Sequence, residues 1–379
     1  MDMALPEIQT QTEADTESPA GPDAARPAAL DVIMQGTVFL DIVFTGLPGL
    51  PTAGTELFAE GMGSSPGGVA NLAVAAARLG LHTGLSAAFG DDSYGDFLWT
   101  TLADQEHIDL SASRRFDHWH SPVTVSMAVN RDRAMVTHEH PPPVPIDHLL
   151  NDLPAARAGV VHLGAANGEW AQKASAAGTL LFGDVGWDAT LEWPAEVLDQ
   201  LGQLHAFLPN SAEAMAYTRT EDPRAALMAL ADLVPVVIVT CGGQGSIGLD
   251  GVNGEEEWVP ALPVNAVDAT GAGDVFSAAF IVGTLQNWPL RQRMAFGNLC
   301  AGLAVQQVGG SLAAPGWGDI ADWFGTVTER AGTGSRPALA LRHSYEFLED
   351  VIPAGAAESA HGPGAVRRAS ATIARFSDA

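Results

Sequence analysis

A regular alternation of short apolar runs and helical stretches constrains the fold of this chain more than any other feature. The alternation begins near residue 159, and its apolar runs are Val160–Leu163, Leu180–Phe182, Ala206–Leu208 and Val236–Val239. Runs that are apolar on both sides are typical of buried parallel strands, and helices between such strands return the chain to the same edge of a sheet. The sequence therefore predicts an α/β fold in which helices cover both faces of a parallel sheet.

The residues before this region predict further strands and one helix. Residues 122–138 alternate apolar and polar side chains around a turn at Asn130–Asp132, which predicts a hairpin with one face in water. A helix with an apolar face is expected over residues 67–80. Strand signals occur at Asp31–Met34, where Val38–Leu40 continues the first strand, and at Thr83–Phe89.

The two ends of the chain differ in composition from the rest. Residues 1–30 are rich in Glu, Asp, Pro, Ala and Thr and show no apolar periodicity, so we expect a disordered acidic tail. The folded core is expected to cover residues 31–330. A Gly, Ser and Pro break at 332–337 then opens a C-terminal extension, residues 331–379, which is expected to be partly helical, at 338–351, or disordered.

The overall charge and the cysteine content exclude several classes of protein. The formal net charge is -27 at pH 7, which opposes binding to nucleic acid or to an anionic membrane surface. Two cysteines, Cys241 and Cys300, make neither a disulfide framework nor a zinc cluster, and this fits a reducing compartment. No apolar run approaches the ~18 residues of a membrane span, and the N-terminus lacks the features of a secretory signal. We therefore expect a cytoplasmic protein.

The single lysine of the chain, Lys173, limits the kinds of phosphate site that can be present. It lies in an Ala- and Ser-rich stretch without glycines, so it cannot belong to a Gly-Lys-Ser/Thr phosphate loop. It also does not resemble the strand lysine of protein kinases. We interpret Lys173 as a solvated helix residue rather than as a catalytic amine.

The segment Asp268-Ala-Thr-Gly-Ala-Gly-Asp274 carries the strongest chemical signal. It opens an Ala-rich helix, and the backbone N–H groups at a helix N-terminus form an anion site. Gly271 and Gly273, with Ala272 between them, let that backbone approach a phosphate closely. Asp274 falls in the first turn, where its carboxylate can accept a proton from an attacking hydroxyl. An ordinary helix start after a glycine turn is the structural alternative.

A second glycine-rich segment lies some 200 residues earlier, at about 66–80. Gly67 and Gly68 are expected to open the helix, and Asn71 falls in its first turn, where an amide can satisfy paired sugar hydroxyls. Alone, this segment is equally compatible with a structural helix start.

Together, the two segments resemble the two signatures of the ribokinase-like (PfkB) family of carbohydrate kinases in pattern, order and separation. The resemblance covers about residues 31–330. It implies a three-layer α/β/α sandwich with a small β-sheet lid, here at about 42–62 and 113–140. It also implies a Mg²⁺-dependent transfer of the γ-phosphate of ATP to a sugar hydroxyl, with Asp274 as the base and Gly271, Ala272 and Gly273 as the anion hole.

The resemblance extends to other positions. The family's substrate site corresponds here to five residues: Gly36, Asp41, Gly67, Gly68 and Asn71. The nucleotide site is expected to contain Asn210, Thr240, Gly242, Gly245 and Asn298. Asn210 and Glu213 match the motif that organises Mg²⁺ through water, and Asp268 and Thr270 lie where some members bind a monovalent cation such as K⁺. A homodimer is one option for the assembly.

Some residues depart from the pattern of ribokinase-type members, so ribose does not carry over as the substrate. The first signature lacks its lysine, Gly164 stands in place of a Glu, and Asp184 stands in place of an Asn. The substrate-side segments 36–72 contain carboxylates, such as Asp41, but no Arg or Lys. Because a sugar phosphate needs cations, which only Arg131 and Arg133 could supply, we expect a neutral sugar.

Several alternatives stay open. Within the family, a nucleoside kinase is the main one, because Phe39, Phe58 or Trp119 could stack on a base. A catalytically silent ligand sensor could share the fold. The run Gly243–Gly248 formally matches a dinucleotide motif, although turn residues rather than a helix follow it. His118, His120, His138 and His140 could bind a metal but are better explained as surface or substrate-side residues.

Overall fold

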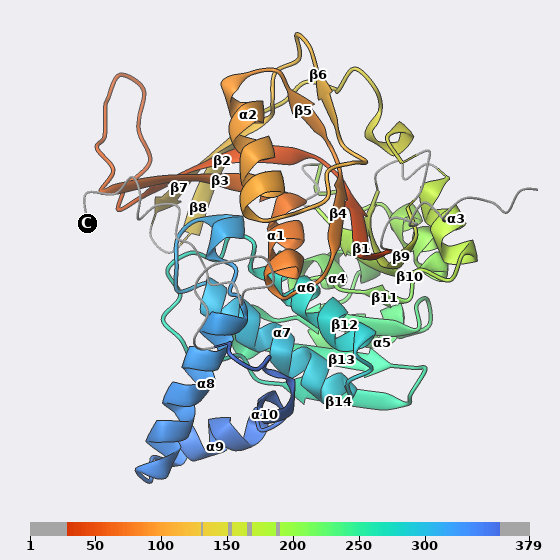
Figure 1. Ribbon diagram of the computed structural model, residues 1–379, viewed down its shortest axis with the longest axis vertical. Helices are drawn as coiled ribbons and strands as arrows, with labels where there is room; N and C mark the ends of the chain where they lie inside the picture. Colours follow the sequence, from red (N-terminus) through yellow and green to blue (C-terminus); the bar gives the residue numbers. More distant parts are fainter. Residues whose placement is uncertain (1–28, 130–131, 151–153, 165–168, 187–189, 357–379) are drawn as a thin grey trace, which may run out of the picture.

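The structure is a computed structural model and describes residues 29–129, 132–150, 154–164, 169–186 and 190–356. Its centre is an eight-stranded sheet with the strand order β14-β13-β12-β11-β10-β9-β1-β4 (Figure 1). Neighbouring strands from β12 to β4 are parallel, whereas β13 and β14 are antiparallel. The strands are β1 (Leu30–Gln35), β4 (Thr83–Ser86), β9 (Ala156–Leu163), β10 (Leu180–Val185), β11 (Ala206–Phe207), β12 (Val236–Thr240), β13 (Ser246–Asp250) and β14 (Glu255–Val259).

Helices cover both faces of this sheet and bury two separate apolar cores. Alternate residues of β12 show the division, because Val236 and Ile238 enter one core and Val237 and Val239 the other. The first core is covered by α1 (Ala70–Arg78), α2 (Ser93–Trp99), α6 (Ala272–Leu285), α7 (Leu290–Ala304) and α8 (Trp317–Gly332). The second is covered by α3 (Trp170–Ala176), α4 (Ser211–Thr218) and α5 (Pro223–Ala231). The predicted parallel α/β sandwich is confirmed.

A smaller four-stranded sheet forms a lid beside the main sheet. Its order is β3-β2-β7-β8, from the strands β2 (Val38–Thr45), β3 (Gly61–Gly68), β7 (Val123–Val129) and β8 (Asp132–His138). The hairpin predicted at 122–138 is present as β7 and β8, and its turn at 130–131 lies outside the described residues. Two short strands, β5 (Ala88–Gly90) and β6 (Arg114–Phe116), form a third sheet.

Two details of the sequence prediction are wrong near the lid. Val38–Leu40 does not continue the first strand but begins β2, which belongs to the lid sheet, and Gly67 and Gly68 end β3 rather than opening a helix. The helix starts only at Ala70. The backbone explains the second error, since Gly68 has φ +63° and an added Cβ there would lie 2.3 Å from the carbonyl oxygen of Thr37.

The C-terminal part continues beyond α8 with two helices where the sequence predicts one. They are α9 (Arg336–Ser344) and α10 (Leu348–Val351). Tyr345, between them, is 4% exposed, and Leu348 is fully buried in the first core. The N-terminal tail and residues 357–379 lie outside the described residues. Among the helices of the described ranges, none has both the length and the apolar character needed to cross a membrane.

Candidate active site

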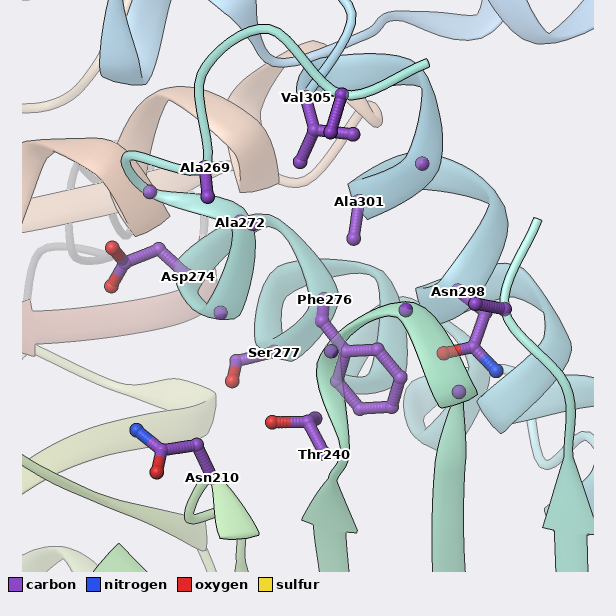
Figure 2. A pocket seen from close by; sticks show the side chains of 18 of the residues that line it. Asn210, Thr240, Ala269, Ala272, Asp274, Phe276, Ser277, Asn298, Ala301 and Val305 are labelled. Atoms are coloured by element: carbon purple, nitrogen blue, oxygen red, sulfur yellow. The ribbon is translucent and has the colours of Figure 1, made fainter. Parts of the chain in front are cut away.

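A cavity of about 600 Å³ lies at the carboxyl ends of β10, β11 and β12, where the first turns of α4 and α6 meet it. This edge is where ligands bind in open α/β sheets. Figure 2 shows Asp274, Ser277, Thr240 and Asn210 around the same open space. Ten of the residues singled out from the sequence line this cavity: Asn210, Glu213, Thr240, Gly242, Gly245, Gly271, Ala272, Gly273, Asp274 and Asn298.

The N-terminus of α6 forms one wall of the cavity. Gly271 is its N-cap and has φ +73°, a left-handed conformation that favours glycine. In the described chain, the N–H of Ala272 donates to Ala269 and that of Val275 to Gly271, while no backbone partner is recorded for the N–H of Gly273. An added Cβ at Gly273 would meet nothing within 4 Å. The first turn therefore offers a phosphate both access and N–H donors.

The two glycine-rich segments meet at the base of this helix. Asn71, the second residue of α1, donates from Nδ2 to Oδ2 of Asp274 at 3.2 Å. An added Cβ at Gly271 would lie 3.2 Å from Cγ of Asn71, so a glycine keeps the two segments in close contact. The amide thereby fixes one oxygen of the Asp274 carboxylate and leaves the other for an incoming hydroxyl.

Three carboxylates, Asp184, Glu213 and Asp274, line the cavity, and none of the described residues that line it is Lys, Arg or His. Burial raises the pKa of Asp274 from 3.8 to about 8, and the charges of Asp184, Asp41 and Glu213 add to the rise against the hydrogen bond from Asn71. Burial likewise raises the pKa of Glu213 to about 7. Burial also raises the pKa of Asp184, although the charge of His162 opposes the rise. Ionisation of all three carboxyls in this buried cavity is therefore unfavourable.

The Asn-x-x-Glu motif at the start of α4 also has a structural role. The side-chain oxygen of Asn210 accepts from the N–H of Glu213 at 3.0 Å, and Oε2 of Glu213 accepts from the N–H of Asn210 at 2.9 Å. This reciprocal pair is a capping box that satisfies two helix N–H groups. The motif thus holds the helix end at the cavity, and Oε1 of Glu213 is the carboxylate oxygen that the capping box leaves over.

The loop after β12 and the helix α7 form the opposite wall. Gly242 and Gly243 are open, with nothing within 4 Å of an added Cβ, whereas at Gly245 an added Cβ would lie 2.0 Å from the carbonyl oxygen of Val259. The amide nitrogen of Asn298 donates to Ser246 Oγ and to the carbonyls of Val259 and Pro260. Apolar residues that line the same cavity are Leu262, Pro263, Val264, Ala301 and Val305. This wall suits a flat aromatic ring.

The inner face of the lid carries polar residues that the sequence did not single out. Ser65 pairs with Asp41, Asp41 with Thr124, and Thr124 with Thr137, so the four side chains share one face. The hydroxyls of Thr124 and Thr137 lie 3.0 Å apart. The charge of Asp41 adds to the rise in the pKa of Asp274, although none of these four side chains lines the large cavity. The sequence alternation places Thr124 on one face of its strand, but only the pairing of Thr124 with Asp41 shows that both lie on the same face of the sheet.

Glycine is required beside Asp41. An added Cβ at Gly67 would lie 2.0 Å from Oδ2 of Asp41, so the carboxylate packs directly on the glycine. A second cavity of about 180 Å³ lies near this face and is lined in part by Thr37, Trp119, Pro122, Glu139 and His140.

The loop before α6 holds the remaining residues of interest. Oδ1 of Asp268 accepts from the N–H of Thr270 at 2.9 Å and from its hydroxyl at 2.7 Å. Neither residue lines the large cavity. Ser277, which the sequence analysis missed, does line it, because it lies one turn after Asp274 on the same side of α6.

Signals that were set aside in the sequence have structural explanations. Lys173 forms an exposed ion pair with Glu169 on α3. Ser246–Asp250 is a strand rather than the helix that a dinucleotide motif requires. The rings of His138 and His140 lie 4.8 Å apart, but no three His, Cys, Asp or Glu side chains within the described ranges are placed to hold a metal ion.

The sequence matches the model of the pfkB family carbohydrate kinases over residues 54–316. A relative named 5-dehydro-2-deoxygluconokinase, from Bacillus thuringiensis (strain Al Hakam), is 25% identical over 332 residues, which cover 79% of this chain and 96% of the relative.

The fold is similar to those of solved kinase structures. The Arabidopsis thaliana ribokinase complexed with ribose and ATP has a TM-score of 0.63 and 23% identity, and the match covers 76% of this chain and 96% of that chain. A ribokinase-type structure from E. coli, in complex with ATP and Mg²⁺, has a TM-score of 0.63 and 18% identity, covering 75% and 96%. At these identities the likeness establishes the fold.

Proposed function

Because the chain belongs to the pfkB family of carbohydrate kinases, we propose that it transfers the γ-phosphate of ATP to a hydroxyl of a small neutral sugar. One observation carries the assignment of the reaction centre. Asp274 lies in the first turn of α6, beside Gly271–Gly273 at the edge of the large cavity, and is hydrogen-bonded to Asn71 of the other signature.

The cavity suits a nucleotide that arrives with a divalent cation. Its volume of about 600 Å³ is within the range of small-molecule sites. Three ionised carboxylates would repel free ATP. Burial, and after it the charge of neighbouring carboxylates, raises the pKa values of Glu213 and Asp274, and a bound cation would favour their ionised forms. Mg²⁺ keeps several waters and binds through one or two carboxylates plus substrate phosphates. Glu213 and Asn210 would hold it through water, and bound Mg²⁺ would offset charge on the phosphates.

The residues of the chain account for the rest of the transfer. The second oxygen of Asp274 accepts the proton of the attacking hydroxyl, while Asn71 holds the first oxygen in place. Charge that develops on the transferred phosphoryl group meets the N–H groups of the first turn of α6, with Gly273 giving them room. Thr240, Gly242 and Gly245 border the phosphates, and the apolar wall beside Asn298 holds the adenine.

The lid supplies the acceptor site. Asp41, Ser65, Thr124 and Thr137 present hydroxyl and carboxylate groups, which bind sugar hydroxyls and repel an anion. Gly67 and Gly68 let Asp41 and the start of α1 come close together. Arg131 lies outside the described residues, as does the side chain of Arg133. A neutral sugar therefore fits this face better than an acid or a sugar phosphate.

The name of the Bacillus thuringiensis relative denotes an acidic acceptor, so the substrate charge is a direct test. We would compare kcat/KM for fructose, ribose, adenosine, fructose 6-phosphate and 5-dehydro-2-deoxygluconate with ATP and Mg²⁺. A neutral sugar is expected to have the highest value. If an anionic acceptor exceeds it by more than tenfold, the neutral assignment is wrong. If adenosine exceeds it, the protein is a nucleoside kinase, and if no acceptor reacts it is a ligand sensor.

Three finer expectations belong to this proposal. Asp268 and Thr270 would bind K⁺ beside the anion hole, which a comparison of turnover in K⁺ and in tetramethylammonium salts would test.

Two chains would pair through the outer face of the lid, where Met62 is 41% and Val136 is 63% exposed, and sedimentation would test this. The free Cys241 and Cys300 fit a cytoplasmic location, which cell fractionation would test.

A further inference from the structure

The turn at residues 309–314 contacts both glycine-rich segments, the one at 66–71 and the one at 268–274. It includes a short 3₁₀ helix at Gly310–Ala313. The hydroxyl of Ser311 donates to the carbonyl of Pro66, directly before Gly67. At the other side, the N–H of Gly309 donates to Oδ2 of Asp268 at 3.4 Å. One short turn therefore contacts both the segment that carries Asn71 and the loop that leads to Asp274.

The turn makes no recorded hydrogen bond to the two buried polar atoms that it covers. An added Cβ at Gly310 would lie 3.3 Å from Oδ1 of Asn71 and 3.5 Å from Oγ of Ser65. Within the described residues, neither of these oxygen atoms has a hydrogen-bond partner. The position of the turn next to Asn71 must therefore depend on hydrogen bonds between the turn and other residues.

Arg78 supplies the strongest of these ties. Its side chain is buried at 2% exposure and donates from one terminal nitrogen to the carbonyls of Leu312, at 2.9 Å, and Ala314, at 2.7 Å. The other two nitrogens donate to both carboxylate oxygens of Glu106, at 3.1 and 2.7 Å. The ion pair compensates the buried charge, so the guanidinium can hold the two carbonyls.

Arg78 is also placed to couple the turn to the catalytic pair. It lies seven residues after Asn71 on α1, so both side chains project from the same side of that helix. The planar guanidinium binds the carboxylate and the carbonyls at once, which the single ammonium of a lysine cannot do in the same geometry.

We propose that Arg78 is a positioning residue for phosphoryl transfer: it holds the 309–314 turn, and through the turn the contact between Asn71 and Asp274. The role concerns the reaction centre of the proposed function and rests on it. Asn71 orients the carboxylate that takes the proton, so a small displacement of this pair slows the chemical step without removing any group that binds ATP or the sugar.

Two variants separate this role from stability. In Arg78→Lys the charge stays and the bonds to the carbonyls are lost, so we expect kcat to fall about 10- to 100-fold, the range for a small misplacement of reacting groups. KM for ATP and for the sugar should change less than threefold. Ser311→Ala removes a second tie of the turn, the hydrogen bond to the carbonyl of Pro66, and should lower kcat in the same manner.

Matched controls come from the same chain. Glu106→Gln breaks the ion pair but leaves Arg78 on the carbonyls, so stability should fall while kcat stays within about threefold of wild type. Arg293→Lys disrupts a second buried pair, with Asp250, where the side chains are 4% and 1% exposed. It should lower the Tm about as much as Arg78→Lys and leave kcat unchanged.

A measurement without turnover keeps the inference independent of the proposed function. Hydrogen exchange of ligand-free protein should be faster in Arg78→Lys than in Arg293→Lys for peptides that cover 66–71, 268–274 and 309–314. Equal exchange in the two variants, or a kcat that falls no further in Arg78→Lys than in Arg293→Lys, overturns the positioning role. If wild type transfers phosphate to no acceptor, the proposed function fails, and the exchange data still decide whether Arg78 holds these segments.

Discussion

At the residue scale, Asp274 combines two opposing influences. The hydrogen bond from Asn71 favours its ionised form, whereas burial and three nearby carboxylates favour its protonated form, and the balance sets its pKa at about 8. A base with such a pKa is strong enough to accept a proton from a hydroxyl, but it must first lose its own. Cation binding in the cavity would lower the pKa and bring the base into its active form.

Replacement of the base tests this role directly. We expect Asp274→Asn to lower kcat by about 10²- to 10⁴-fold, because an amide cannot accept the proton, while ATP affinity stays close to that of wild type. Single-turnover kinetics and calorimetric titration with ATP would measure the two effects. Asp222→Asn, at the cap of α5, is the control for loss of a carboxylate and should retain activity. A loss below tenfold in Asp274→Asn contradicts the assignment.

The same carboxyl makes stability depend on pH. Its pKa is about 8 in the folded protein against an ordinary 3.8, so between these values the folded state holds a proton that the unfolded chain releases. Raising the pH over this range therefore favours unfolding. The gain in Tm of Asp274→Asn over wild type should grow from pH 5 to pH 8 and level off above it. Thermal melts without Mg²⁺ measure this, and a pH-independent gain would exclude the raised pKa.

At the element scale, short helix starts and strand ends carry the site, and their chemistry can be separated from their structural roles. The start of α4 is an example, because Glu213 both caps the helix and faces the cavity. Glutamine can also close a capping box. Glu213→Gln therefore removes the charge and keeps the cap.

We expect Glu213→Gln to raise the Mg²⁺ concentration at half-maximal activity several-fold while the KM for the sugar stays unchanged. The reason is that in our proposal the carboxylate would hold metal-bound water at the nucleotide rather than contact the sugar. Magnesium titrations at a fixed total ATP concentration measure the effect, and curves that overlay those of wild type would show that the motif has only its capping role.

The lid sheet offers a test of acceptor recognition. Thr124→Val keeps the shape of a side chain on the inner face and removes its hydroxyl, so we expect the KM for the sugar to rise about five- to tenfold, the equivalent of one hydrogen bond at about 1 kcal/mol or slightly more. KM for ATP should not change. Ser64→Ala, on the outer face beside Ile42, is the matched control. Equal effects of the two substitutions would exclude a role for the inner face.

At the scale of the whole molecule, the C-terminal helices are part of the folded core. Rings of Trp323 and Tyr345 lie 5.0 Å apart, and those of Trp288 and Phe347 lie 5.6 Å apart, so the segment after α8 packs back onto α8 and onto the connection between α6 and α7. Leu348 is fully buried in the same core as the helices of the site. Loss of this packing should therefore weaken the entire domain.

We expect Leu348→Ala to lower the free energy of unfolding by about 2–5 kcal/mol, as for other buried leucines. Leu339→Ala removes the same atoms from a side chain that is 49% exposed on α9, and should change it by less than about 0.5 kcal/mol. Denaturant unfolding of the two variants measures the difference. Similar small effects would show that the extension folds apart from the core.

The sequence alone determined the layers of the fold and indicated the reaction centre that we propose. Apolar runs of strand length, separated by helical stretches, leave few arrangements other than a parallel sheet covered on both faces. The reaction centre was accessible because Gly271, Gly273 and Asp274 are adjacent in the chain, so their local geometry follows from a single glycine turn at a helix start.

Only the tertiary structure decided which distant residues meet. The sequence could not show that β2 leaves the main sheet, since Val38–Leu40 is apolar like β1, and the branch depends on pairing with β3 and β7. Only that pairing register shows that Thr124 and Ser65 lie on the same face as Asp41. The ties from Arg78 to the 309–314 turn span 234 and 236 residues, and a buried arginine on an Ala-rich helix has no local signal. Long-range contacts of this kind arise from packing, because a buried charge such as that of Arg78 is stable only where the fold brings partners to it.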